Sequence, residues 1–168
     1  MKKIREAAVV LGALTFVAAC PPPEDMTPDA GGGGMVEATF TSLYGDYFTN
    51  CKNCHAPGAP GRTSDIETTL DFSTKATAYT SIKTGMAAGL TGNKAMCNGV
   101  PFLGTTPAKS LLLAVIDQPT RQAIDLSPTF PNCDIDTITD ATVKSGKQPS
   151  TAFVSALKTW ITNGAMNN

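Results

Sequence analysis

Two cysteines and a histidine fall within five residues, as Cys51-Lys52-Asn53-Cys54-His55. Two thiols at this spacing can form thioether bonds to the two vinyl groups of one haem, and a histidine beside the second thiol can then reach the iron. Neutral imidazole is a strong axial ligand to haem iron, and His55 is the only histidine in the chain. The motif therefore predicts one covalent haem c held by Cys51, Cys54 and His55, with His55 as the proximal iron ligand.

Three other interpretations of the motif compete with haem attachment. A thioredoxin-like redox pair uses the same gap between cysteines, but it belongs beside a βαβ pattern, which this sequence lacks. A structural zinc site needs four ligands, and the two cysteines further along the chain are far away and widely separated. A chance match of so short a motif is the third. Haem attachment remains our prediction.

The N-terminus has the features of an export signal. Three basic side chains within the first five residues precede an apolar run over residues 7–19 that ends in small residues. This run is too short to span a bilayer comfortably, and its pattern is typical of a secretory signal peptide. Residues 17–19 followed by Cys20 resemble the lipobox of bacterial lipoproteins, which implies cleavage before Cys20 and lipidation of its thiol. An ordinary signal peptide with a chance cysteine is the alternative.

The mature chain from Cys20 is expected to consist of a tether and one domain. Residues 20–35 contain prolines, acidic residues and four consecutive glycines, a composition that cannot bury apolar surface. Residues 36–168 form the expected domain. Removal of the signal peptide leaves ten basic and thirteen acidic side chains, a mild negative balance that argues against a nucleic-acid partner. The expected membrane contact is therefore the lipid anchor, which would hold the protein on a bacterial membrane facing the periplasm or the cell surface.

Helical spacing of apolar residues predicts an all-α fold with long loops. Helices are expected over residues 35–50, 74–83, 108–116 and from Pro149–Ser150 to a cap at Gly164. The last is the clearest, because Phe153, Val154, Leu157, Trp160 and Ile161 form one apolar stripe. Irregular structure is expected over residues 56–62, 89–104 and most of 117–148, and no alternating pattern predicts a strand.

At this point the chain resembles the small mono-haem c-type cytochrome domains found on lipoproteins of myxobacteria and planctomycetes. Beyond the haem motif, the resemblance rests on Leu70-Asp71-Phe72-Ser73, on Tyr79, and on Trp160-Ile161 with Gly164-Ala165. It covers about residues 36–165. It implies a cytochrome c-like helical fold, with the first and last helices crossing near the haem edge, and a role in electron transfer.

The distal iron ligand departs from the family pattern. Members usually supply a methionine shortly before the last helix, where this chain has none over residues 142–149. Met96 is the first candidate, with Met86 and a deprotonated Lys144 as alternatives, and a weak or vacant sixth position filled by water also stays open. A thioether ligand would raise the reduction potential and favour electron transfer, whereas an open iron could bind small molecules.

Cysteine arithmetic predicts a disulfide. With Cys20 lipidated and Cys51 and Cys54 on haem, Cys97 and Cys133 remain. Two such cysteines in an exported protein are expected to pair. Two free thiols are the alternative.

The sequence thus predicts a membrane-tethered electron carrier that exchanges electrons with redox partner proteins, without a residue for bond-making catalysis. A haem sensor or peroxidase-like protein with an open iron is the second hypothesis. A haem-free structural lipoprotein stapled by disulfides is the third.

Overall fold

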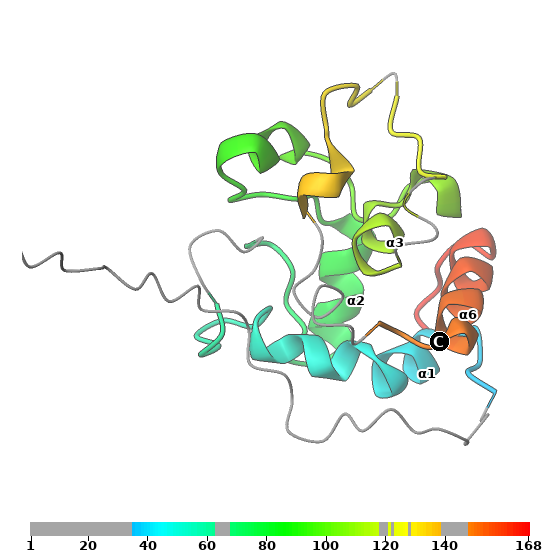
Figure 1. Cartoon of the computed structure of the whole chain (residues 1–168). Coiled ribbons are helices and arrows are strands. Elements are labelled where there is room, and N and C mark those ends of the chain that lie inside the picture. The colour runs from blue at the N-terminus through cyan, green and yellow to red at the C-terminus, as the bar shows by residue number, and fades with distance from the viewer. Residues whose placement is uncertain (1–34, 63–67, 118–120, 122, 128, 139–147) are drawn as a thin grey trace, which may run out of the picture.

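The computed structural model describes residues 35–62, 68–117, 121, 123–127, 129–138 and 148–168 (Figure 1). The regular structure of these residues is helical, and their only β-type pairing is an isolated bridge between Met86 and Pro101. The predicted all-α class is therefore confirmed. The helical segments are α1 (Phe40–Asp46), η1 (Phe48–Asn53), α2 (Lys75–Thr84), η2 (Gly92–Cys97), η3 (Pro107–Lys109), α3 (Leu111–Ile116), η4 (Ile135–Ile138) and α6 (Thr151–Thr162), where η denotes a 3₁₀ helix.

The first helix is shorter than the predicted 35–50. Its N-cap is Thr39, whose side-chain oxygen accepts a hydrogen bond from the amide of Ser42. At Tyr47 the backbone leaves the helical region (φ −132°, ψ −49°), and the chain continues as the 3₁₀ segment η1. The prediction of one continuous helix was wrong, and the change of helix type leads directly into the cysteine motif.

The second helix begins and ends close to its predicted bounds. Thr74 and Thr77 form a reciprocal capping box at the start of α2, which satisfies two amides that a helix end otherwise leaves without partners. Gly85 is the C-cap, and a Cβ atom there would lie 2.0 Å from the Ser81 carbonyl oxygen. Any larger residue at position 85 would therefore force the end of α2 to shift.

The helix predicted over residues 108–116 is divided in two. Ser110 lies between η3 and α3 with extended backbone angles (φ −102°, ψ 110°). Its buried hydroxyl donates to the Thr106 carbonyl and accepts from the Gly104 amide. Serine competes with helical hydrogen bonding in this way, so the pattern of apolar residues alone overstated the helix.

The last helix agrees with its predicted start and cap. The Ser150 hydroxyl oxygen accepts a hydrogen bond from the Phe153 amide at the start of α6. Gly164 follows the helix with a φ of +88°, a left-handed conformation that glycine adopts without steric penalty. The whole predicted apolar stripe of this helix is buried.

A cluster of aromatic rings joins α1, α2 and α6. Phe40 is 0% exposed, and its ring centroid lies between 5.3 and 6.3 Å from those of Tyr44, Phe48, Tyr79 and Trp160. Figure 1 shows α1 beside α6 and α2, in agreement with the contacts between these helices. Burial of such rings is the main stabilising contribution of the core.

The C-terminal tail folds back onto the start of α1. The Asn168 side-chain oxygen accepts from the Phe40 amide at 3.0 Å, and its backbone oxygen accepts from the Thr41 amide at 2.8 Å. The Trp160 indole donates to the Met166 carbonyl at 2.7 Å. The tail therefore satisfies helix-start amides of α1 and ties the two ends of the domain together.

The regions predicted as loops contain little regular structure. Residues 56–62 are irregular, as expected. Residues 89–104 hold the short segment η2, and the described part of 117–148 holds η4. The predicted signal peptide, Cys20 and nearly all of the predicted tether lie outside the described residues. No helix in the described ranges is long and apolar enough to cross a bilayer.

Candidate functional site

The three motif residues lie on one turn of the chain at the end of η1. The carbonyl of Cys51 accepts a hydrogen bond from the Cys54 amide at 3.2 Å and another from the His55 amide at 2.8 Å. Cys54 is buried, with 9% of its surface exposed, while Cys51 and His55 are half-buried. The structure therefore brings all three predicted residues together, as their spacing requires.

The loop after the motif folds back against it. The Gly61 amide donates to the Asn53 carbonyl at 3.1 Å, and the Arg62 amide donates to the Ala59 carbonyl at 3.0 Å. The Arg62 guanidinium in turn donates to the Thr68 carbonyl. These bonds close the loop on the motif turn.

His55 contacts the segment that includes Phe72. The Phe72 amide donates to the His55 carbonyl at 2.6 Å, and the two ring centroids lie 6.0 Å apart in an edge-on arrangement of 72°. The Nδ1 atom of His55 is buried and makes no hydrogen bond, although other atoms of the residue have partners. Phe72 thus contacts His55 through both its backbone amide and its ring.

Phe72 also connects the motif to the aromatic core. Its ring lies 5.5 Å from that of Phe48, which belongs to η1 itself. Leu70 and Phe72 are buried, whereas Asp71 and Ser73 are not. This alternation of buried and exposed residues can be seen in the sequence. The residues against which Leu70 and Phe72 pack cannot be seen there. Sequence reasoning therefore found Phe72 only as part of a resemblance and missed its contact with His55.

The two methionine candidates for a distal ligand lie at the surface of the domain. Met86 and Met96 are 53% and 54% exposed. Met86 lies at the bridge to Pro101, next to Ala87, which is buried. Because neighbouring residues of extended chain point to opposite sides, the Met86 side chain points away from the core. Lys144 lies outside the described residues.

Cys97 and Cys133 are joined by a disulfide, which is the pair expected from the cysteine count. The two sulfur atoms lie 2.08 Å apart and the two Cα atoms 4.5 Å apart. Cys97 ends η2 and is 0% exposed, and Cys133 lies just before η4. The bond therefore links the end of η2 to the segment that leads into η4.

The donor atoms of the motif fit one covalently bound haem. Two cysteine sulfurs and one imidazole on a single turn are the set that such attachment needs. Among the residues described, no three or more His, Cys, Asp or Glu side chains are grouped to hold a metal ion.

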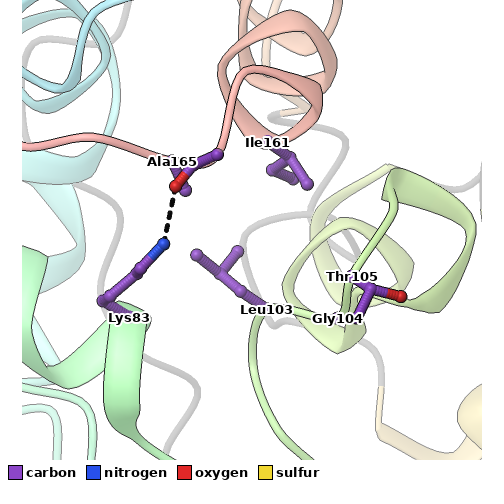
Figure 2. Close-up of a pocket in the computed structure, with 7 residues that line it drawn as sticks. Lys83, Leu103, Gly104, Thr105, Ile161 and Ala165 are labelled. Carbon is purple, nitrogen blue, oxygen red and sulfur yellow. Dashed lines mark hydrogen bonds between the residues drawn. The ribbon is translucent and has the colours of Figure 1, made fainter.

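Two hollows lie away from the motif. One, of about 300 Å³, is bounded by Lys83, Leu103, Thr105, Ile161 and Ala165 (Figure 2). In it the Lys83 ammonium group donates to the Gly164 carbonyl at 2.6 Å, which satisfies a carbonyl at the end of α6. The other, of about 350 Å³, lies along α2. Neither is lined by a motif residue, so the motif turn itself is the candidate site.

Comparison with known proteins provides no relative for this site. No family model, no curated protein and no solved structure matches the chain.

Proposed function

We propose that the protein is an exported, lipid-anchored c-type cytochrome that transfers electrons through one covalent haem. The observation that carries the proposal is the single turn on which Cys51, Cys54 and His55 lie, with both later amides bonded to the Cys51 carbonyl. That turn presents two sulfurs and an imidazole from the same short stretch of backbone. This arrangement suits attachment of one flat macrocycle through its vinyl groups and its iron.

Each motif residue has a separate task in this proposal. Cys51 and Cys54 would hold the group through thioether bonds, and His55 would bind its iron as the proximal ligand. When bound, the haem supplies a one-electron couple between the ferric and ferrous states. Phe72 would hold His55 in place from the core side, through its amide and its ring. The proposed role needs no group for bond-making chemistry, and the protein would carry electrons between redox partner proteins.

The arrangement of helices supports a cytochrome c-like fold as part of the proposal. The first helix, α1, packs against the last, α6, and also against α2. Phe40 and Trp160 join α1 to α6, with ring centroids 5.4 Å apart. The motif begins inside η1, the short 3₁₀ segment that follows α1, so the packed helices fix the start of the motif turn.

Membrane attachment through Cys20 is the second part of the proposal. The basic start, the apolar run and the small residues before Cys20 support export and lipidation. Acyl chains would then supply the membrane affinity. Residues 21–35 would allow the domain to reach its redox partners from the membrane surface.

One observation favours a second candidate, a haem-free structural lipoprotein. Cys97 and Cys133 form a disulfide, which can staple the domain without a haem. A chain in which Cys54 forms a disulfide instead of a thioether cannot carry haem at that sulfur. The two candidates therefore differ in the chemical state of one atom, the Sγ of Cys54.

The test compares two pairs of cysteines in the full chain. The protein is expressed in a bacterial host that matures other c-type cytochromes, then denatured, and haem that stays on the polypeptide is stained and quantified as the pyridine haemochrome. We expect covalent haem on the wild type and on Cys97→Ala/Cys133→Ala. We expect none on Cys51→Ala/Cys54→Ala. A wild type without haem, in a host whose other cytochromes are loaded, would exclude the carrier and leave the disulfide-stapled lipoprotein.

A further inference from the structure

The backbone of Phe72 is held from both sides. Its amide donates to the His55 carbonyl at 2.6 Å, and its carbonyl accepts from the Tyr44 hydroxyl at 3.0 Å. Phe72 is 2% exposed. A buried residue bonded at both of its backbone polar groups has little freedom to move. The place of Phe72 therefore depends on α1, the helix that carries Tyr44.

We propose that Tyr44 is a positioning residue for the imidazole of His55. Tyr44 fixes Phe72, and the Phe72 ring lies edge-on to the imidazole with centroids 6.0 Å apart. The connection runs from a hydroxyl on α1, through one buried residue, to the histidine of the motif. The imidazole direction is then set by α1 as well as by the motif turn. The positioning of the His55 imidazole by Tyr44 is argued from these contacts. That the imidazole then binds iron rests on the proposed function.

Tyr44 is itself fixed by the core. Its ring lies 6.3 Å from that of Phe40, which is fully buried. Phe72 is braced from another direction by Phe48, with ring centroids 5.5 Å apart. The Tyr44 hydroxyl bonds to the Phe72 carbonyl, and loss of the hydroxyl frees that carbonyl without emptying the core. Tyr44→Phe therefore removes the hydrogen bond while keeping the ring.

The chain contains a matched control for this substitution. Tyr79 also packs its ring on Phe40, and its hydroxyl donates to the Ala165 carbonyl at 3.1 Å. Both hydroxyls are part-buried donors to a backbone carbonyl. The Tyr79 bond, however, holds the tail after α6 and does not involve Phe72. Tyr79→Phe thus loses a similar hydrogen bond away from the motif.

The first arm of the test uses the full chain expressed without haem-attachment machinery. Because His55 is the only histidine, its imidazole C–H signals in an NMR spectrum are assigned without further work. We expect Tyr44→Phe to lose the nuclear Overhauser effect between this imidazole and the Phe72 ring, and to shift the imidazole signals. Tyr79→Phe should keep both. Imidazole signals that are the same in Tyr44→Phe as in Tyr79→Phe would overturn the positioning role, whether or not the chain carries haem.

The second arm uses the haem-loaded chain. Ligand orientation tunes the reduction potential of the iron, so we expect the potential of Tyr44→Phe to shift and that of Tyr79→Phe to stay at the wild-type value. A changed imidazole signal with an unchanged reduction potential would show that Tyr44 does not position His55 as an iron ligand. Failure to load haem, with the first arm positive, would instead exclude the proposed function and leave the positioning of His55 intact.

Discussion

Removal of the disulfide between Cys97 and Cys133 should destabilise the domain strongly. The variant is Cys97→Ala/Cys133→Ala, which removes this disulfide and leaves the motif cysteines in place. The two segments that the disulfide joins contain only short 3₁₀ turns, η2 and η4. They have few backbone hydrogen bonds of regular structure to hold them when the covalent link is gone.

The expected magnitude follows from the length of the closed loop. The two cysteines are 36 residues apart in the sequence. In the chain-entropy model, a loop of this length lowers the entropy of the unfolded chain enough to stabilise the fold by about 4 kcal/mol. The total stability of a domain is about 5–15 kcal/mol. The disulfide therefore accounts for a large share of the free energy of unfolding.

Urea denaturation, followed by the fluorescence of the single tryptophan, measures the effect. With an m-value of about 2 kcal/mol per M, a loss of about 4 kcal/mol lowers the midpoint by about 2 M. The m-value itself should rise, because an unfolded chain without the cross-link exposes more surface to urea. Both proteins must have the same haem content, since a bound cofactor adds stability of its own.

Two results would refute this reasoning. A midpoint within about 0.5 M of the wild type would mean that packing, rather than the covalent link, holds the two segments. A lower midpoint with an unchanged m-value would mean that the bond acts on the folded state and not on the unfolded chain. In the second case the loop-length argument fails even though the disulfide matters.

Three further substitutions test the core, a helix cap and a titrating group. Phe48→Ala empties a fully buried ring site, so thermal denaturation should show a loss of about 3–5 kcal/mol, and a loss below 1 kcal/mol would contradict the packing described. Ser150→Ala removes the N-cap bond of α6 and should lower the unfolding free energy by about 1 kcal/mol, whereas the exposed neighbour Thr151→Ala should change it far less. Hydrogen bonds from Ser127, the side-chain bond being the larger cause, lower the pKa of Asp125 below its ordinary value. A carboxyl group whose pKa is lower in the folded than in the unfolded chain stabilises the fold at pH values above its unfolded pKa. This stabilisation is lost as the pH falls through the folded pKa. Ser127→Ala should therefore raise the pKa of Asp125 in a carboxyl NMR titration, and an unchanged value would contradict the assigned cause.

Local sequence signals were sufficient for the elements with strong ends. Thr74 marks the start of α2, and Ser150 and Gly164 mark the two ends of α6, because capping depends on residues close to the helix end in the chain. The apolar stripe of α6 is long enough for its period to be clear. The motif turn was predictable for the same reason, since Cys51, Cys54 and His55 are local to one another.

Breaks in the helices and contacts between distant segments were not predictable in this way. Apolar spacing continues through Tyr47 and Ser110, yet both positions interrupt a helix. At Ser110 the cause is a buried hydroxyl bonded to the preceding turn, which competes with the helix only once that turn has formed. The bonds of Phe72 to His55 and Tyr44 join residues 17 and 28 positions apart. Such pairing depends on tertiary packing, so the sequence indicated the motif but not the residues that hold it.

The chemical state of Cys54 tests the central claim most directly. Intact mass spectrometry of the denatured full chain, purified from a host that matures c-type cytochromes, measures it in one experiment. The account predicts a mass increased by one haem, with peptide mapping that places both thioethers on Cys51 and Cys54. A chain without the added mass, whose Cys54 is recovered in a disulfide after digestion under non-reducing conditions, would contradict it.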